Sequence, residues 1–331
     1  MKTALICGAN GQDGAYLARL LLEKDYAVWG TSRDAQARPA ANLQRLGIGK
    51  QIRMVSMSPI DFRQVYVTIL KAKPDEVYFL AGQSSVGLSF DQPAETMESI
   101  AIGTLNILEA CRMANWPIRL YHAGSSECFG DTGGISADES TPFQPRSPYA
   151  VAKASAYWLV KSYRQAYDLF ACTGILFNHE SPLRPLRFVT QKIVHAASRI
   201  AKGSGERLRI GDLSVERDWG WAPEYVEAMW LMLQQEEPRD FVVATGQSHP
   251  LQSFLAKAFS CFDLDWRDHV DRDEALLRPN ELRQSLASPL KAEVDLGWKA
   301  SVFLDGVVER MANAATASVG QPELTWDKRL P

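Results

Sequence analysis

The first 22 residues constrain the fold of this chain more than any other segment. Residues 3–7 (TALIC) form a short apolar run that is typical of a buried strand, and residues 15–22 form an apolar stretch with helical spacing. Between them lie three glycines, Gly8, Gly11 and Gly14. A strand that turns on glycines into a helix brings backbone N–H groups and a helix N-terminus close to a pyrophosphate. The segment therefore predicts a dinucleotide-binding turn, although its spacing is G-x-x-G-x-x-G rather than the G-x-G-x-x-G of many dehydrogenases.

Apolar runs of strand length alternate with helical runs through the first half of the chain. This alternation predicts an α/β fold, a Rossmann-type doubly wound parallel sheet. In such sheets ligands bind at the carboxyl ends of the strands, where residues 80–84 and 124–127 follow two of the predicted strands. The predicted strands after the first are 26–31, 74–82, 119–124 and 173–178, and the predicted helices include 103–114 and 148–167.

The composition of the sequence changes near Asn178, after which proline and turn residues are more frequent. We expect a second, smaller and mixed C-terminal domain that binds the substrate. The expected division is 1–178 for the dinucleotide-binding domain with 214–246 returning to it, 179–213 and 247–318 for the substrate-binding part, and 319–331 as a polar tail.

The composition excludes several functional classes. A chain of 331 residues with 46% hydrophobic residues can bury a large core. A formal net charge of −3 without a basic run argues against nucleic-acid binding, and no segment is typical of a signal peptide or a membrane span. The five cysteines (7, 111, 128, 172 and 261) are scattered without metal-ligand spacing, so we expect no metal site and reduced core thiols in a cytoplasmic protein.

Tyr149 and Lys153 are four residues apart and directly follow Ser147 and Pro148. Serine followed by proline is typical of a helix N-cap and first helical position, so both later side chains are expected on one helix face. A phenol has a pKa of about 10, but a neighbouring cation favours the phenolate, which suits Tyr149 to proton transfer. Tyr-x-x-x-Lys also arises by chance in amphipathic helices; the glycine turn in the same chain favours the catalytic interpretation.

The second predicted strand ends at Ser32, Arg33 and Asp34, where a dinucleotide fold contacts the adenosine ribose. Arg33 suits a 2′-phosphate, whereas Asp34 suits a free 2′-hydroxyl or simply neutralises Arg38. We favour NADP as the cofactor, with NAD as the alternative.

Seven motifs in order carry a resemblance over nearly the whole chain. The run GILFNHESP at 174–182 is the most specific of them. The others are GANGQDGAYL at 8–17, LAGQS at 80–84, PRSPYA at 145–150, FVT at 188–190, RDWG at 217–220 and ATG at 244–246. Together they resemble the GDP-mannose 4,6-dehydratase family of the extended short-chain dehydrogenase/reductase superfamily.

The resemblance implies a lyase that converts GDP-mannose to GDP-4-keto-6-deoxymannose plus water, by hydride transfer through bound NADP. In this scheme Tyr149 removes the proton of the C4 hydroxyl, Lys153 holds the nicotinamide ribose and Ser125 hydrogen-bonds the sugar O4. Glu127 takes the proton from C5 and helps water to leave from C6. A carboxylate suits that step, because a ketone at C4 acidifies C5.

The resemblance also implies binding residues and an assembly, either a homodimer or a homotetramer. Two of the residues have simpler explanations: His179 as a core histidine, and Arg217 as half of a surface ion pair with Asp218. The implied cofactor residues are Gly8, Gly11, Gln12, Asp13, Gly14, Arg33, Leu80, Ala81, Gly82, Gln83, Ser84, Tyr149, Lys153, His179 and Arg184. The implied sugar-nucleotide residues are Asn178, Val189, Lys192, Arg217, Arg278 and Glu281.

Several positions depart from the family pattern. Ser58 replaces an aspartate that faces the adenine, Phe79 replaces an asparagine, and Gly82 replaces an alanine. Residues 33–36 replace an arginine-serine segment that helps to join tetramers. Cofactor choice and assembly are therefore open.

Three further departures lie at the guanosine end, where Arg283, Ala287 and Ser288 replace an aspartate, a glycine and an acidic or amide residue. A dehydratase that acts on a GDP-heptose or another GDP-hexose is therefore an alternative. An epimerase or ketoreductase of the same superfamily, or a dinucleotide sensor, would not need a carboxylate at position 127, so Glu127 argues against these classes.

Overall fold

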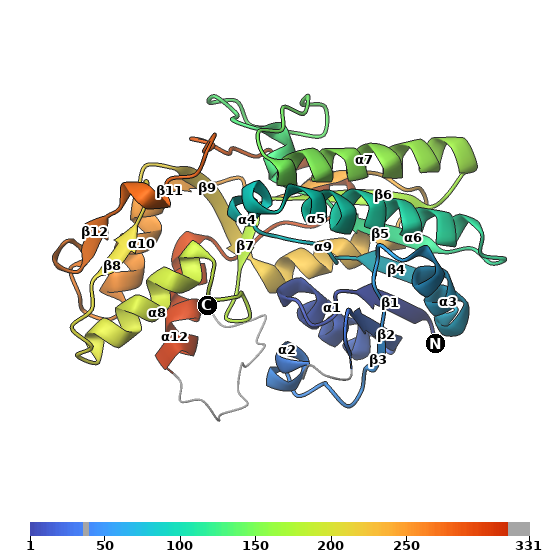
Figure 1. Cartoon of the computed structure of the whole chain (residues 1–331), viewed down its shortest axis with the longest axis horizontal. Coiled ribbons are helices and arrows are strands. Elements are labelled where there is room, and N and C mark those ends of the chain that lie inside the picture. Colours follow the sequence, from blue (N-terminus) through green and yellow to red (C-terminus); the bar gives the residue numbers. More distant parts are fainter. Residues whose placement is uncertain (36–39, 317–331) are drawn as a thin grey trace.

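The computed structural model describes residues 1–35 and 40–316 and is built around a seven-stranded parallel sheet (Figure 1). The strand order is β10-β6-β5-β4-β1-β2-β3, which confirms the predicted doubly wound fold. The predicted tail at 319–331 lies outside the described residues. The strands of this main sheet are β1 (Thr3–Cys7), β2 (Ala27–Ser32), β3 (Arg53–Ser56), β4 (Glu76–Phe79), β5 (Arg119–Ala123), β6 (Ala171–Leu176) and β10 (Phe241–Val243).

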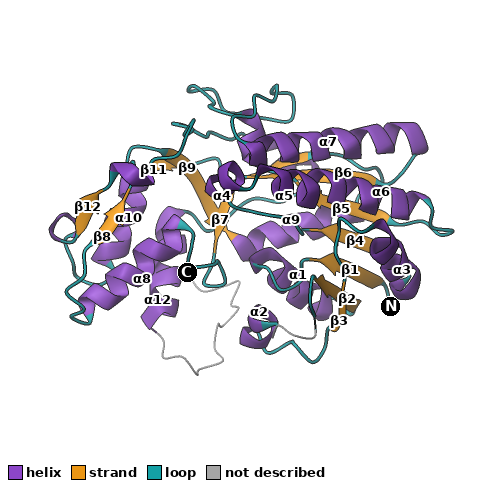
Figure 2. Ribbon diagram, in the orientation of Figure 1, coloured by secondary structure: helices purple, strands orange, loops and turns teal. Residues whose placement is uncertain are grey.

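Helices cover both faces of the main sheet (Figure 2). Those that flank it are α1 (Gln12–Glu23) and α9 (Ala222–Gln234) on one face, and α3 (Phe62–Ala72), α6 (Gly103–Arg112) and α7 (Pro148–Tyr167) on the other. The remaining helices are α2 (Ala41–Arg45), α4 (Val86–Asp91), α5 (Pro93–Met97), α8 (Val189–Ala201), α10 (Leu251–Ser260), α11 (Leu290–Asp295) and α12 (Leu304–Thr316). Four shorter helical segments are the π-helix η1 (Glu98–Ile102) and the 3₁₀ turns η2 (Ser126–Phe129), η3 (Trp266–Asp268) and η4 (Glu274–Leu276).

Strand β1 explains why both faces must be covered. Its residues Ala4 and Ile6 belong to a hydrophobic cluster with α1 and α9, whereas Leu5 and Cys7 belong to a second cluster with α3 and α6. Successive side chains of a strand point to opposite faces, so an apolar run without alternation needs helices on both sides. All four residues are fully buried.

The predicted element ends are correct where local signals are strong. Helix α7 spans Pro148–Tyr167 as predicted, and the Ser147 hydroxyl accepts a hydrogen bond from the Ala150 N–H at 3.1 Å. Two strand predictions are wrong at their ends. Strand β4 stops at Phe79, before the turn at Gly82, and β6 covers Ala171–Leu176 rather than 173–178. The chain leaves the main sheet there because residue 178 pairs with β9 of another sheet.

A second group of elements, drawn from residues 178–316, lies to the left of the main sheet in Figure 1. Helices α8, α10 and α12 pack around a separate hydrophobic cluster that includes Trp219 and Phe254. Within residues 214–246, β9 pairs with β7 and β11, whereas α9 packs on α1 and β10 joins the main sheet. The division into domains stays a prediction. The strands here are β7 (Asn178–Glu180), β9 (Glu216–Trp221) and β11 (Ser248–Pro250) in one sheet, and β8 (Leu208–Ile210) and β12 (Val270–Arg272) in another.

Two features bear on the predictions made from composition. In the part of the chain that the structure describes, no helix combines the length and the apolar character needed to cross a bilayer. All five cysteines are free thiols, and four of them are buried. The prediction of a core position is wrong for Cys261, which follows the last residue of α10 and is exposed.

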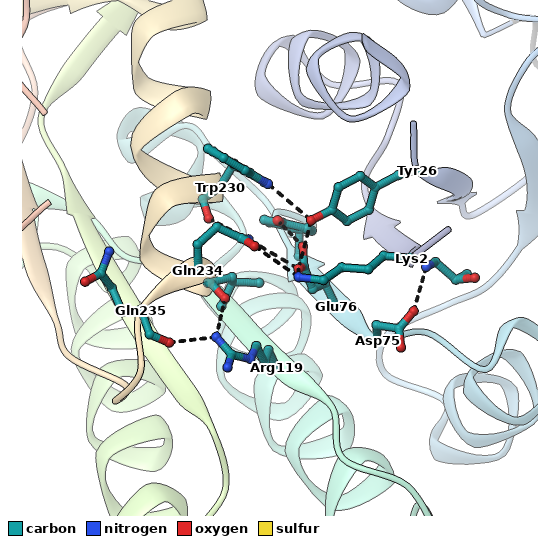
Figure 3. Close-up of polar contacts among 11 residues, drawn as sticks. Lys2, Tyr26, Asp75, Glu76, Arg119, Trp230, Gln234 and Gln235 are labelled. Atoms are coloured by element: carbon teal, nitrogen blue, oxygen red, sulfur yellow. Dashed lines mark hydrogen bonds and ion pairs between the residues drawn. The ribbon is translucent and has the colours of Figure 1, made fainter. Parts of the chain in front are cut away.

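The amino ends of the central strands are joined to α9 by a polar network around a buried carboxylate (Figure 3). Its centre is Glu76, the fully buried first residue of β4. One carboxylate oxygen accepts hydrogen bonds from Lys2 at 2.9 Å, from the Tyr26 hydroxyl at 3.0 Å and from the Gln234 amide at 3.2 Å. The other oxygen accepts from the Tyr78 hydroxyl at 2.7 Å. We call these five residues the amino-edge network.

Two further contacts extend the network along α9 (Figure 3). The Trp230 indole N–H donates to the Tyr26 hydroxyl at 3.2 Å. The Arg119 guanidinium donates to the carbonyls of Leu233 and Gln235, both at 2.7 Å. A cation on the last carbonyls of a helix satisfies acceptors that have no intrahelical donor. The C-terminal end of α9 is therefore fixed to the amino edge of the sheet.

Candidate active site

The glycine turn between β1 and α1 has no room for side chains. Gly8 has a φ of +90°, a backbone conformation that favours glycine. A Cβ on Gly14 would lie 2.3 Å from the Gly8 carbonyl oxygen, and a Cβ on Gly8 would lie 3.2 Å from the Cα of Ala81. Gly11 is the N-cap of α1. The turn therefore leaves its backbone and the start of α1 open to a close ligand, which fits the pyrophosphate of a dinucleotide.

The loop after β4, residues 80–84, lies against this turn through Ala81. Gly82 has a φ of +134°, where an alanine would be strained, so the departure from the family pattern at this position has a conformational reason. The Gln83 amide points inward and donates to the Thr96 hydroxyl at 3.2 Å, whereas Ser84 is exposed. The structure thus brings the predicted loop and the glycine turn together.

His179 joins the glycine turn to β7. Its Nε2 lies 3.0 Å from an Asp13 carboxylate oxygen, and its Nδ1–H donates to the Phe177 carbonyl at 2.7 Å. The Gln12 amide donates to the His179 carbonyl at 3.1 Å. Burial opposes ionisation of both partners, but the charge of His179 lowers the pKa of Asp13 to about 2, and Asp13 raises the pKa of His179. The imidazole, stacked on Tyr225 at 4.5 Å, is therefore an ion-paired histidine beside the turn.

Tyr149 and Lys153 lie in the first turns of α7, next to the end of β5. The Lys153 ammonium donates to the Ala123 carbonyl at 2.8 Å and lies 5.8 Å from the centroid of the Tyr149 ring. Burial lowers the pKa of Lys153 to about 8. Burial also raises the pKa of Tyr149, and a hydrogen bond with the Ser125 side chain opposes that rise. The three side chains therefore meet as the sequence predicts.

Glu127 lies in η2, the 3₁₀ turn that follows β5. The Ser125 hydroxyl accepts a hydrogen bond from the Glu127 N–H at 3.3 Å, which fixes the start of this turn. Burial raises the pKa of the Glu127 carboxyl, the positive charges of Arg217 and Arg278 oppose the rise, and the negative charge of Glu281 adds to it. A carboxyl with a raised pKa beside two cations is suited to take up and release a proton.

Arg217 and Arg278 are joined by one carboxylate. An Nη2–H of Arg217 donates to one oxygen of Glu281 at 2.8 Å, and the Nε of Arg278 lies 3.7 Å from the other oxygen. The Arg217 guanidinium also donates to the carbonyls of Glu216 and Leu282, both at 2.9 Å. The structure therefore brings three of the predicted sugar-nucleotide residues together.

The interpretation of Arg217 and Asp218 as a surface ion pair is wrong. Asp218 is fully buried and accepts hydrogen bonds from the N–H and the hydroxyl of Thr245 and from the N–H of Gly246. Arg217 pairs with Glu281 instead. Sequence reasoning missed this role of Asp218, although the motifs at 217–220 and 244–246 both carried the resemblance. Asp218 fixes the turn after β10 against β9.

A segment that we call the strap, residues 281–288, links η2 to the second group of elements. Its backbone bonds on one side to the loop that follows η2 and on the other to β9. On the first side, the Arg283 N–H donates to the Asp131 carboxylate at 3.0 Å. The carbonyls of Gln284 and Leu286 accept from the N–H groups of Thr132 at 3.2 Å and of Ala137 at 3.0 Å. On the second side the Glu216 N–H donates to the Arg283 carbonyl at 2.8 Å.

Two other predicted cofactor residues are cations that already have carboxylate partners. Arg33 is exposed and lies 3.5 Å from Glu95 of α5. Arg184 is more buried; its Nε lies 3.3 Å from Glu180, and its guanidinium covers the Phe188 ring at 4.0 Å. Exposed pairs are weak and exchange readily with other anions, so Arg33 is available to a phosphate.

The remaining predicted sugar-nucleotide residues lie on β7 and α8. Asn178 is the half-buried first residue of β7, and it pairs with Trp219 of β9. Val189 is the first residue of α8, and Lys192 lies one turn further along on its exposed side. Asn178 is thus next to the strand that carries Arg217. Over residues 1–35 and 40–316, no group of three or more His, Cys, Asp or Glu side chains could hold a metal ion.

Comparisons with known proteins identify relatives of this chain. A family model described as GDP-mannose 4,6 dehydratase matches residues 5–311. GDP-mannose 4,6 dehydratase 1 of Arabidopsis thaliana is 44% identical over 325 residues, which cover 94% of this chain and 89% of the relative.

Solved structures share the fold. The UDP-glucose 4-epimerase of Thermus thermophilus, in complex with NAD, has a TM-score of 0.84 at 25% identity and covers 96% of this chain and 100% of its own. RMD from Pseudomonas aeruginosa, complexed with NADPH, has a TM-score of 0.78 at 20% identity and covers 96% of this chain and 99% of its own. The family model extends over nearly all of the sequence, and the Arabidopsis relative covers a similar share of it. The chain therefore belongs to the GDP-mannose 4,6 dehydratase family.

Proposed function

We propose that this chain converts GDP-mannose to GDP-4-keto-6-deoxymannose and water. The observation that carries the proposal is the position of the buried Glu127 carboxyl, which is close enough to Tyr149, Arg217 and Arg278 for their charges to act on one another. A phenol for oxidation, a carboxyl for removal of water and cations for a diphosphate are thus gathered in one place.

A nicotinamide cofactor fits the glycine turn, because any Cβ at Gly14 would collide with the backbone that must approach the pyrophosphate. When bound, this group would supply an acceptor for the hydride from C4 and a hydride donor to C6. The NAD and NADPH in complex with the two structural neighbours support this assignment. No external oxidant is consumed, because the electrons taken from C4 are given back to C6.

The first half of the reaction oxidises C4. Tyr149 accepts the proton of the C4 hydroxyl, while Ser125, its hydrogen-bond partner, orients the C4 oxygen. Because burial raises the pKa of the Tyr149 phenol, positive charge beside it is needed to form the phenolate. Lys153, whose ammonium lies 5.8 Å from the tyrosine ring, supplies part of that charge.

The second half removes water. The C4 ketone acidifies C5, and Glu127 takes the C5 proton and passes it to the C6 hydroxyl, which departs as water. The proton that Tyr149 took from the C4 hydroxyl is then given back at C5, and it balances the hydride that a bound cofactor would return to C6. Burial raises the proton affinity of the Glu127 carboxyl, which suits a group that accepts a proton and gives it back.

We further propose NADP rather than NAD as the cofactor. Arg33 lies at the carboxyl end of β2, and its contact with Glu95 is long and exposed, so a 2′-phosphate can replace that carboxylate. In a fluorescence titration, Arg33→Gln should weaken NADP⁺ binding about tenfold, roughly 1.4 kcal/mol, and leave NAD⁺ binding unchanged. Equal losses for both dinucleotides would contradict the assignment.

The assembly and the compartment are also proposals. Val151 and Trp158 are exposed on α7, seven residues apart and therefore on one helix face, and Ile102 is exposed at the end of η1, which packs against α7. We expect this face to be covered by a second copy of the chain in a homodimer, which can pair into a homotetramer. Light scattering of the wild type and of Trp158→Glu tests the assembly.

The free thiols fit a reducing cytoplasm.

The decisive test of the proposed function is a substrate panel. Purified protein is incubated with NADP⁺ and with GDP-mannose, other GDP-hexoses, a GDP-heptose and UDP-sugars, and mass spectrometry follows the loss of one water. We expect loss of water from GDP-mannose without net reduction of the cofactor. An isomer of unchanged mass would instead indicate an epimerase, and loss of water from a different GDP-sugar alone would change the substrate.

A further inference from the structure

Glu281 has the geometry of an anion that fills the space between two guanidiniums. One of its oxygens accepts from Arg217 at 2.8 Å, and the other lies 3.7 Å from the Nε of Arg278. The oxygens of a diphosphate bind to paired guanidiniums in the same way. A carboxylate and a diphosphate cannot share these two cations at full strength, because both are negative and compete for the same N–H donors.

The two arginines differ in how firmly they are held. The Arg217 side chain is 9% exposed, and two main-chain carbonyls fix it in addition to Glu281. The Arg278 side chain is 41% exposed, and among the described residues Glu281 is its ion-pair partner. Its Nε would lie 3.9 Å from a Cβ on Gly87, so the guanidinium sits beside α4, just after the loop at 80–84.

The exposure and the hydrogen bonding of the chain change at Glu281. Residues 274–280 are all exposed, and Asn280 has a φ of +52°. The strap that begins at Glu281 is instead held on both sides by main-chain hydrogen bonds. Arg278 therefore projects from an exposed segment, whereas Arg217 belongs to the buried side of the site. Of the contacts of Glu281, the one with Arg278 is the longer and the more exposed, so it is the easier to break.

We propose that Glu281 is an internal counter-ion. Its carboxylate pairs with Arg217 and Arg278 in the enzyme without substrate, and the diphosphate of the substrate takes its place. The proposal rests on the proposed function, in which the substrate is a sugar nucleotide. The diphosphate breaks the contact between Glu281 and Arg278, and the carboxylate turns toward the neighbouring hydroxyl donors of the ligand. The counter-ion prevents the two like charges from repelling each other before substrate arrives, but it weakens the affinity for a bare diphosphate.

The test measures inorganic pyrophosphate binding by calorimetry to the full chain saturated with NADP⁺, so that the glycine turn is already filled. Glu281→Gln should bind pyrophosphate at least about threefold more tightly than the wild type, since a competing charge is removed. The matched control is Glu274→Gln, which removes an exposed carboxylate from the same segment and should change affinity by less than about 1.5-fold. A loss of structure in Glu281→Gln would weaken binding, so tighter binding cannot come from misfolding.

A double-mutant cycle with Arg278→Gln locates the effect. In the Arg278→Gln background, the gain from Glu281→Gln should be smaller, because Arg278, one of the two cations for which the two anions compete, is gone. Unchanged or weaker pyrophosphate binding by Glu281→Gln, in a wild-type enzyme that still removes water from a GDP-sugar, overturns this inference and leaves the proposed function intact. Failure of the wild type to remove water from any GDP-sugar overturns the proposed function.

Discussion

Glu76 at the amino edge of the main sheet and Glu127 at its carboxyl edge are both largely surrounded by protein, but their partners differ. The Glu76 carboxylate accepts four hydrogen bonds, from Lys2, Tyr26, Tyr78 and Gln234. For the Glu127 carboxylate, the described part of the chain provides no hydrogen-bond donor, and burial raises its pKa.

The contrast separates the two uses of a buried carboxyl. A carboxylate with a full set of donors contributes to a fixed structure. At the amino edge, burial raises the pKa of Tyr78 well above its usual value, so this phenol keeps its proton and remains a hydrogen-bond donor to Glu76. A carboxyl without donors keeps its oxygens free for a ligand and its proton exchangeable. The proposed active site therefore lies at the edge where the Glu127 carboxyl is left without hydrogen-bond donors from the described part of the chain.

Removal of the Glu127 charge should have the largest effect. Glu127→Gln keeps the shape of the side chain but removes the base, so the rate of water loss should fall on the order of 10³-fold. NADP⁺ binding and the thermal midpoint should stay at wild-type values, because no hydrogen bond to the carboxylate is lost. Single-turnover assays of product mass and thermal melting measure the two effects. Formation of the 6-deoxy product at the parental rate would disprove the assigned role.

The equivalent change at the amino edge should have the opposite profile. Glu76→Gln places an amide N–H₂ among four donors, so the free energy of unfolding should decrease by about 3 kcal/mol. The turnover of the folded fraction should stay within about twofold of the wild type, because the change is at the far end of the strands. Urea unfolding measures stability, with the exposed Glu23→Gln of α1 as control. A loss of turnover without a loss of stability would remove the contrast between the two edges.

The pH dependence of stability should show the smallest effect. Asp13 raises the folded-state pKa of His179 above its ordinary 6.5, so protonation of this group stabilises the fold most below pH 6.5. This contribution is lost as the pH rises through the folded-state pKa, so the free energy of unfolding should decrease above pH 6.5. The pH range of this measurement must end below pH 8. The pKa of Lys153 is lowered to about 8, so above that pH the titration of Lys153 makes the free energy of unfolding increase with pH instead. In His179→Gln the decrease should be absent; an unchanged pH profile would exclude the ion pair with Asp13.

The parts of the fold that sequence predicts well are those set by neighbouring residues. The glycine turn and the start of α7 follow from adjacent residues, Gly8 to Gly14 and Ser147 with Pro148. The predicted C-terminal ends of β4 and β6 are wrong because apolar residues continue past the point where strand pairing stops. Pairing partners such as Trp219, which holds residue 178, are far away in the sequence.

The site residues differ in the same way: local spacing predicts the proximity of some of them but not of others. The spacing of Tyr149 and Lys153 indicates their proximity directly, whereas the arrangement of Arg217, Arg278 and Glu281 came from family resemblance and their ion pairs from the structure. The amino-edge network gave no signal in the sequence, because its members lie between positions 2 and 234 and meet only through the order of the strands.

The way in which the strap is attached has an evolutionary consequence. Its contacts to the loop after η2 and to β9 are made mostly by main-chain N–H and carbonyl groups, which every residue type other than proline can provide. Arg283, Ala287 and Ser288, three of the positions where the sequence departs from the pattern of the family that it resembles, all lie on the strap. Substitutions at these positions can therefore change the side chains of the strap without breaking its main-chain attachment to the loop after η2 and to β9.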